Sequence, residues 1–412
     1  MSDRLRGRVL DTSSPGARRS LVILVESASH ALDLAPSAPD LLAGDLVTLR
    51  LAADGAHVEA IHGRAAPGAF RAEGDALRWR RPAESPSRME TLWARQAILR
   101  AIRDHFHDEG FLEIQAPLLV KGACPDAHLE PLHAGGDAYL TTSTEYQIKR
   151  MIVGGFDKVF TLTQNFRGSD VGGRHNPEFT MLEWARTYAS LEDIERDAEA
   201  LVKRAFRALH PDPGIDTLRW QGRDVRIDGP WDRVTVRDAL ARHLGIQAAP
   251  DLSPASLRSE VARLGLDVPA SFLDDDALLV SYLIDAMQPR LGAPAPTFLC
   301  DWPAFMTSSA AILDGAPALA DRSELLVAGL ELSDGFPSLR DPDLQARLFD
   351  RENARRRDEG REPVALDTRY LAALREGIPP GAGMALGIDR LVMILTGRER
   401  IRDVLALAWD EL

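Results

Sequence analysis

Two stretches in which apolar and polar residues alternate flank a polar, Gly-rich loop between residues 159 and 188. Side chains two positions apart on a strand point to the same face. Phe179 and Glu183 are therefore expected on one face of the second strand, with Arg167 near the end of the first and His175 in the loop. The pattern predicts an antiparallel hairpin where cations, a ring and a carboxylate converge, a set that suits a nucleotide. The alternative is an ordinary hairpin with a solvated charged loop.

A second pattern lies close to the C-terminus. Residues 384–388 form an apolar run of strand length, and residues 390–396 have the spacing of an apolar helix. Arg390 then stands at a helix N-terminus, where a cation is unfavourable by about 0.3–1 kcal/mol. A neighbouring anion would remove that cost. The glycines of this segment also fit a dinucleotide-binding loop, but no βαβ unit with a later acidic residue surrounds them, so that interpretation is discounted.

An acidic hairpin is predicted between residues 323 and 336. Ala328-Gly329 suits a two-residue turn, and counting outward from it pairs Leu326 with Glu331. Glu324 shares a face with Leu326, so Glu324 and Glu331 become diagonal neighbours, with backbones about 7–8 Å apart. Two carboxylates at that separation can share a magnesium ion that also binds phosphate oxygens. The alternative is a pair of solvated surface acids.

Residues 1–69 are predicted to form a small β domain. Strand-like runs bounded by turn residues occur at residues 5–10, 20–26, 45–51 and 57–62. This segment contains no Phe, Tyr or Trp. Residues 70–87 are read as a linker, and residues 88–412 as the large domain. That domain is expected to begin with a helix after Ser87 that Gly110 ends, and a strand at residues 111–115; residues 190–290 are read as helical insertions.

Composition narrows the class of protein. The chain has 412 residues, 45% of them hydrophobic, and a formal net charge of -13, which disfavours general binding of nucleic acid. Its two cysteines, Cys124 and Cys300, are not expected to form a disulfide framework or a four-ligand zinc site. No signal peptide and no apolar run of membrane-spanning length are recognised, so a cytoplasmic protein without membrane contact is expected.

The predicted hairpin at residues 159–188 resembles motif 2 of the class II aminoacyl-tRNA synthetases, and the C-terminal pattern resembles their motif 3. The sequences F-R, R-H-N-P-E-F-T-M-L-E and G-I-D-R-L-V-M are most similar to the lysyl branch. Within it, M-L-E-W and A-L-G-I-D-R, with Ala385, resemble the family that attaches lysine or β-lysine to elongation factor P. From about residue 88 onward, the resemblance implies an α+β fold with an antiparallel sheet flanked by helices. The N-terminal segment would then be an OB-like β-barrel.

The resemblance also implies a reaction and a set of site residues. ATP would activate an amino acid as an aminoacyl-adenylate, with Arg167 and Arg390 as the catalytic residues. Arg167 would bridge the substrate carboxylate and the α-phosphate, because a planar guanidinium can hold two oxygens. Other ATP contacts would come from Ser169, His175, Phe179 and Arg390, with magnesium held by Glu324 and Glu331. The amino acid would contact Ser143 and Glu145, placed together on one strand face, and Glu183, Asp334, Ser338 and Ala385.

Several of these positions depart from the family pattern. F-R-N-E becomes F-R-G-S-D, so Ser169 replaces a glutamate expected at the adenine. N-G-F-x-E becomes D-G-F-P-S, which puts Asp334 in place of an amide and Ser338 in place of a glutamate, and Ala185 replaces a tyrosine. An ammonium without a partner in a dry pocket costs several kcal/mol. Either the substrate ammonium binds differently, or the substrate is not lysine.

The leading hypothesis is a ligase that adenylates a lysine-like amino acid and transfers it to a lysine of elongation factor P. Its support is the aromatic-free N-terminal segment, because OB domains bind unpaired bases largely by stacking on rings. The first alternative is a lysyl-tRNA ligase, and tRNA is judged the less favoured acceptor. The others are a non-catalytic paralogue that binds or regulates a partner and a ligase for another amino acid. The helix and strand after Ser87 resemble motif 1, which implies a homodimer.

Overall fold

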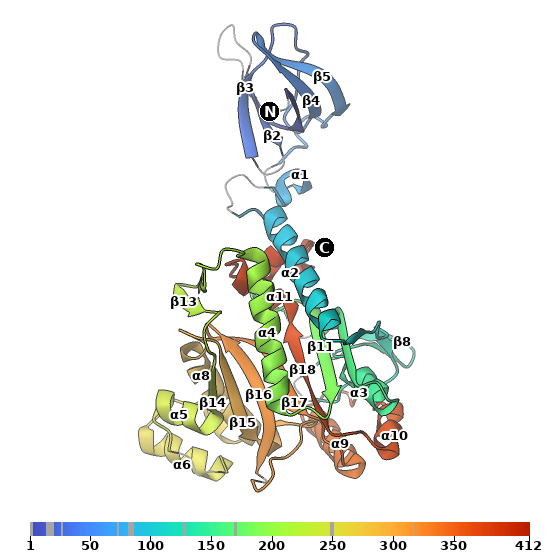
Figure 1. The fold of residues 1–412 in the computed structure, drawn as a ribbon, viewed down its shortest axis with the longest axis vertical. Coiled ribbons are helices and arrows are strands. Elements are labelled where there is room, and N and C mark those ends of the chain that lie inside the picture. The colour runs from blue at the N-terminus through green and yellow to red at the C-terminus, as the bar shows by residue number, and fades with distance from the viewer. Residues whose placement is uncertain are drawn as a thin grey trace. The chain divides into compact units, whose positions relative to one another are not determined.

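The computed structural model describes residues 3–13, 20–25, 28–71, 74–80, 86–126, 129–168, 171–247, 251–316 and 318–412 (Figure 1). The chain divides into two compact units, Met1–Ala94 and Arg95–Leu412. The division falls within helix α2 (Arg88–Asp108). Within the described residues, no helix is both long and apolar enough to cross a membrane.

The N-terminal unit is built on one five-stranded antiparallel sheet in the order β3-β2-β1-β4-β5. Its strands are β1 (Arg4–Ser13), β2 (Ser20–Val25), β3 (Ala28–Asp33), β4 (Leu46–Ala52) and β5 (Gly55–Gly63). Val9, Ile23, Val47 and Leu49 are fully buried in its core. The four predicted strands are present. The strand that sequence analysis missed, β3, reads A-S-H-A-L-D and has only one large apolar residue, so it carries little strand signal.

The second unit contains an eight-stranded sheet in the order β14-β15-β16-β17-β18-β11-β10-β6. All neighbouring pairs are antiparallel except the two at the edges, β14–β15 and β10–β6. The strands are β6 (Leu112–Glu113), β10 (Lys158–Phe166), β11 (Glu178–Thr187), β14 (Asp232–Thr235), β15 (Thr297–Pro303), β16 (Leu319–Val327), β17 (Leu330–Pro337) and β18 (Gly381–Gly387). The predicted α+β class is confirmed.

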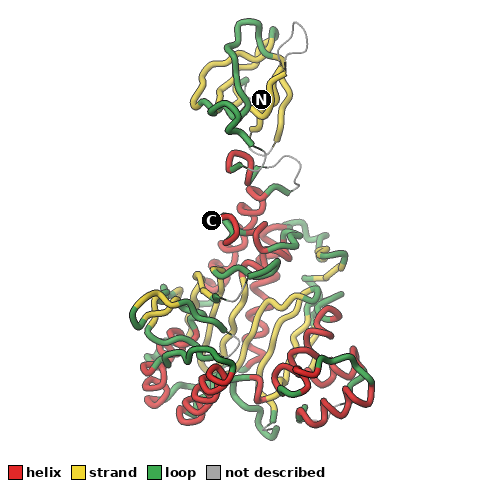
Figure 2. Tube along the Cα trace, turned by 180° about the vertical axis from the view of Figure 1, so that it is seen from behind, coloured by secondary structure: helices red, strands yellow, loops and turns green. Residues whose placement is uncertain are grey.

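The main core lies on the sheet face covered by α2, α4 (Leu191–Leu209) and α11 (Ile388–Leu395), as seen in Figure 1. Phe160, Trp184 and Met384 point into this core and are almost completely buried. Because side chains alternate along each strand, their neighbours Glu183 and Ala385 face the opposite side. Figure 2 views that opposite face, where the strands lie between two groups of helices.

Two groups of helices flank this open face of the sheet. Helices α3 (Glu145–Val153), α9 (Pro342–Asp358) and α10 (Thr368–Glu376) pack together at one side. Helices α5 (Val236–Leu244), α6 (Pro254–Leu264), α7 (Ala270–Leu273) and α8 (Asp276–Met287) form the other group. The remaining short elements are α1 (Asp75–Arg78), β7 (Leu119–Val120), β8 (His133–Gly135), β9 (Ala138–Leu140), β12 (Thr217–Trp220), β13 (Arg223–Arg226) and the 3-10 turns Gln288–Arg290, Ala304–Met306, Ile401–Val404 and Trp409–Glu411.

Two predictions for the large domain differ from the structure: the length of the strand after the first helix, and the helical character of residues 190–290. The helix after Ser87 is present, and Ser87 and Glu90 form its capping box. The strand predicted after it is only Leu112–Glu113. The interpretation of residues 190–290 as helical is wrong in part, because β12, β13 and β14 interrupt the helices. Gln221 and Gly222 turn the chain with positive φ angles of 46° and 76°, which closes the β12–β13 hairpin.

Candidate active site

A cavity of about 490 Å³ opens on the face of the main sheet opposite the core. Strands β11, β16, β17 and β18 supply its floor, and α3 and α8 supply walls. Nine residues predicted from sequence line it: Ser143, Glu145, Arg167, Glu183, Glu324, Glu331, Asp334, Ser338 and Ala385. Residues separated by more than 200 positions therefore meet in one place.

The predicted hairpin is formed by β10 and β11, with Asn165 opposite Phe179. Arg167 follows β10 directly, and its guanidinium lies 5.1 Å from the centre of the Phe179 ring. The Nε atom of Arg167 is buried and has no hydrogen-bond partner among the described residues. A buried donor left unpaired costs about 1–3 kcal/mol. An anionic ligand in the cavity would satisfy it.

Arg390, on α11, contacts both the loop that holds His175 and the hairpin that holds Glu331. Its Nη2 atom lies 2.6 Å from Nε2 of His175, and its Nη1 donates to the backbone oxygen of Glu331 at 2.9 Å. The Glu331 carboxylate lies 3.5 Å from the same guanidinium. Arg390 is the third residue of α11. The anion expected beside this helix terminus is therefore present, in the side chain of Glu331.

The β16–β17 hairpin turns at Ala328 and Gly329, whose φ angles of 51° and 80° belong to the left-handed region. Leu326 pairs with Glu331, as counting from the turn predicts. A bulge then shifts the register, so that Glu324 lies opposite Asp334. The extra residue bends the ladder and brings a third carboxylate to the two that were predicted.

Arg322 was missed by sequence analysis, although it is central to this acidic group. It donates from Nη2 to Glu324 at 2.7 Å and from Nε to Asp334 at 2.8 Å, and it lies 4.4 Å from the Trp302 ring. Burial raises the pKa of Glu324, the charge of Arg322 opposes this rise, and the nearby Glu331 adds to it. The sequence feature that could have identified Arg322 is its position two residues before Glu324, which places both side chains on one strand face.

The paired carboxylates of Glu324 and Glu331 have the chemistry of a partial magnesium site. Within the described residues, no group of three or more His, Cys, Asp or Glu is arranged to hold a metal ion. Magnesium at such sites usually takes one or two carboxylates and completes its shell with water and substrate phosphates. Glu324 and Glu331, which face the same cavity, are a donor set of that kind.

At the α3 end of the cavity, Glu145 is the first residue of the helix and pairs with Lys149 at 2.5 Å. Burial alone would lower the pKa of Lys149, but the attraction of Glu145 raises it to about 12. Sequence analysis missed Lys149, which its four-residue spacing from Glu145 could have identified.

The expectation that Ser143 and Glu145 share a strand face is wrong. Ser143 lies in the loop between β9 and α3, because the chain must turn from the short strand into the helix.

Glu183 is 4% exposed and accepts hydrogen bonds from the Ser143 hydroxyl and from the backbone and hydroxyl of Thr144. Burial raises the pKa of its carboxyl, and these donors counteract the rise. No ion pair joins Glu183 to a lysine or arginine within the part of the chain that the structure describes. Ser338 and Ala185, at two of the altered positions, also line the cavity.

Three predicted residues reach the cavity indirectly. His175, Phe179 and Arg390 do not line the cavity themselves. Phe179 contacts Arg167, and Arg390 contacts both Glu331 and His175. Ser169 and its neighbour Asp170 lie outside the described residues. The geometry thus brings together the cationic, aromatic and acidic groups that the three sequence patterns predicted.

An antiparallel sheet with a hairpin-borne arginine, a second arginine on the helix after β18 and an acidic hairpin between them is the architecture of the class II synthetases. The family model described as tRNA synthetases class II (D, K and N) matches residues 74–410. The chain therefore belongs to this family, and the fold class predicted from sequence is confirmed.

Proteins similar to this chain include lysine–tRNA ligases. One from Magnetococcus marinus is 34% identical over 320 residues, which cover 77% of this chain and 63% of the relative. Those of Burkholderia multivorans and Burkholderia mallei are 34% and 35% identical over 330 and 331 residues, covering 78% of this chain and 64% of each relative. The chain thus spans less than two thirds of the length of these relatives.

Proposed function

We propose that this chain is an ATP-dependent ligase that activates a lysine-like amino acid as its aminoacyl-adenylate. The observation that carries the proposal is the convergence of Arg167, Glu324 and Glu331 on one cavity, with Arg390 bonded to Glu331. A substrate carboxylate oxygen attacks the α-phosphorus of ATP, the bond to the bridging oxygen breaks, and pyrophosphate leaves. No protein nucleophile is required, because such phosphoryl transfer depends on positioning and charge stabilisation.

The site residues divide the reaction between them. Arg167 holds the substrate carboxylate and the α-phosphate, and its unpartnered Nε is available for this role. Phe179 presents a ring to adenine, and Arg390 with His175 faces the outer phosphates. Glu324 and Glu331 would hold magnesium, which neutralises phosphate charge when bound.

The amino acid is proposed to bind between α3 and β11. Glu145 faces its α-amino group, and Glu183, which has no cationic partner among the described residues, faces the distal end. The names of the relatives favour lysine. Ser338 and Ala185 leave this end with fewer polar partners than the family pattern has, so a longer or less basic lysine analogue is included in the proposal.

Two acceptors are proposed for the activated amino acid. The relatives are lysine–tRNA ligases, and this favours tRNA as the acceptor. A specific observation favours the second candidate, a lysine of elongation factor P. Residues 1–69 contain no Phe, Tyr or Trp, so this segment offers none of these rings for anticodon bases to stack on.

The experiment is an ATP–pyrophosphate exchange screen across α-lysine, β-lysine, ornithine and the other amino acids, with Arg167→Ala as the negative control. Exchange with at least one lysine-like compound, lost in the variant, is the expected result. Nucleotide binding by calorimetry with no exchange for any amino acid would instead identify a non-catalytic paralogue. Charging of purified tRNA and a mass increase of elongation factor P then distinguish the two acceptors.

A further inference from the structure

Helix α9 is connected to the cavity although none of its described residues lines it. Arg356, near its C-terminal end, is 1% exposed. Each of its three guanidinium nitrogens donates a hydrogen bond: Nε to the backbone oxygen of Glu362 at 2.8 Å, Nη1 to that of Leu129 at 2.6 Å, and Nη2 to the Glu130 carboxylate at 3.0 Å. A buried guanidinium with this set of partners fixes the segment at Leu129 and Glu130 to α9.

That segment in turn holds the backbone beside Arg167. The backbone oxygen of Glu130 accepts a hydrogen bond from the Gly168 amide at 2.8 Å. A Cβ at Gly168 would lie 2.9 Å from the Leu132 side chain, so the chain is closely packed here. The Arg167 amide donates to the backbone oxygen of Pro177 at 2.9 Å, and the Nε of its side chain has no described partner. These contacts therefore hold the backbone from which the Arg167 side chain extends toward the cavity.

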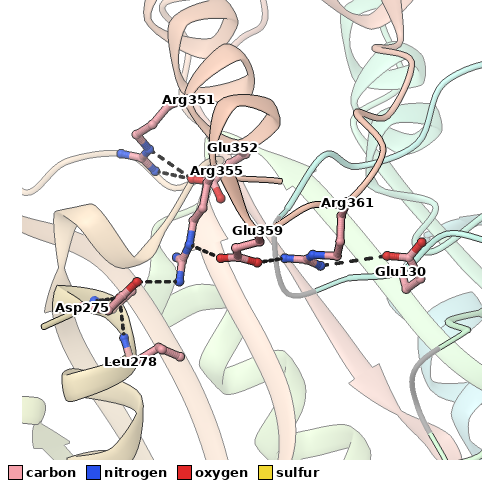
Figure 3. Close-up of polar contacts among 9 residues, drawn as sticks. Glu130, Asp275, Leu278, Arg351, Glu352, Arg355, Glu359 and Arg361 are labelled. Atoms are coloured by element: carbon pink, nitrogen blue, oxygen red, sulfur yellow. Dashed lines mark hydrogen bonds and ion pairs between the residues drawn. The ribbon is translucent and has the colours of Figure 1, made fainter. Parts of the chain in front are cut away.

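Figure 3 shows a chain of ion pairs that extends from Glu130 through Arg361, Glu359 and Arg355 to Asp275. Arg361 contacts both Glu130, at 3.9 Å, and Glu359, while Arg355 contacts Glu359 at 2.9 Å and Asp275 at 3.3 Å. Asp275 caps α8, which lines the cavity. These side chains are between 24% and 46% exposed, so each pair contributes only about 0–1 kcal/mol. The buried Arg356 is the stronger of the two connections.

We propose that Arg356 is a positioning residue that acts through Glu130 and the Gly168 amide to hold Arg167 against the reacting carboxylate and α-phosphate. The inference rests on the proposed function, in which Arg167 contacts those groups. An arginine is needed because its rigid fork of donors reaches three acceptors at fixed angles, whereas a lysine ammonium is a point charge on a flexible stem. A displacement of about 1 Å at a reacting centre can slow a reaction about 100-fold.

The test compares Arg356→Lys with Arg357→Lys, its exposed neighbour on α9, as the matched control. In pyrophosphate exchange, Arg356→Lys is expected to lower kcat roughly 10- to 100-fold, with KM for ATP and for the amino acid changed less than about threefold. The control is expected to match the wild type. Equal losses in both variants, or a rise in KM at unchanged kcat, would contradict a positioning role.

A double-mutant cycle separates this role from general damage to the fold. If Arg356 acts through Arg167, Arg167→Lys combined with Arg356→Lys should be no more than about threefold slower than Arg167→Lys alone. Rate losses that multiply in the double variant would overturn the inference. Glu130→Gln, which keeps the backbone contact to Gly168, provides a second variant if Arg356→Lys does not fold.

A readout independent of activity completes the test. Arg356→Lys is expected to speed hydrogen–deuterium exchange of the Gly168 amide at least tenfold, whereas Arg357→Lys leaves it unchanged. If the wild type shows no pyrophosphate exchange, the proposed function fails, and amide exchange still decides whether Arg356 holds this backbone. Unchanged exchange at Gly168 in both Arg356→Lys and Glu130→Gln would refute the inference.

Discussion

Removal of the Arg322 charge should destabilise the second unit strongly, because it leaves two acids without their cation. The side chains of Arg322 and Glu324 are 16% and 11% exposed, and that of Asp334 is 32% exposed. Breaking a buried ion pair by removing one partner costs about 3–5 kcal/mol. Because Asp334 is partly exposed, Arg322→Met is expected to lower the free energy of unfolding by about 3 kcal/mol, the lower end of this range. The methionine retains the contact of the side-chain stem with Trp302, so lost packing contributes little to this loss of stability.

The assay is urea unfolding followed by tryptophan fluorescence, with Arg357→Met as a control that removes an exposed arginine. Bound magnesium and ATP should restore part of the lost stability, since the ion would supply positive charge beside Glu324. A loss below about 1 kcal/mol, or the same loss in the control, would refute the idea that Arg322 neutralises the acidic hairpin.

Three further outcomes are expected. Ser338→Glu combined with Ala185→Tyr should lower KM for lysine about tenfold or more by giving the distal ammonium a partner, measured by pyrophosphate exchange; an unchanged KM would place the side chain elsewhere. Phe179→Ala should weaken ATP binding about tenfold in calorimetry, because a stacked base contributes about 1–3 kcal/mol; wild-type affinity would exclude stacking on this ring. Because pairing raises the pKa of Lys149 from 10.5 to about 12, its contribution to stability is complete below pH 10.5 and lost as the pH rises toward 12. Lys149→Met should therefore flatten the stability profile above pH 10.5, and an identical profile in urea unfolding would contradict the pairing.

Local patterns in the sequence were sufficient to predict the parts of the site that a single hairpin determines. Alternation along β11 placed Phe179 and Glu183 on one face of the strand, and the Ala328-Gly329 turn fixed the pairing of Leu326 with Glu331. The amphipathic spacing after Gly387 located α11 and therefore Arg390. These features depend on side-chain period and turn chemistry, which are readable over a few residues.

Features that depend on distant partners could not be predicted in this way. The bulge that places Asp334 opposite Glu324 has no local signal, and Arg322 gains its importance only from both acids together. Ser143 was placed on a strand because the loop before α3 contains residues that also suit strands. Arg356 lies 226 residues from Glu130, and its role appears only when α9 is packed against that segment.

The proposed activity requires that Arg167, Arg390 and the acidic hairpin bind one nucleotide together. A crystal structure with magnesium and a non-hydrolysable ATP analogue tests it most directly. We expect α-phosphate oxygens within hydrogen-bond distance of Arg167, outer phosphates beside Arg390 and His175, and a metal ion between these phosphates and Glu324 or Glu331. A nucleotide bound elsewhere, or one that leaves Arg167 without a phosphate contact, would contradict it.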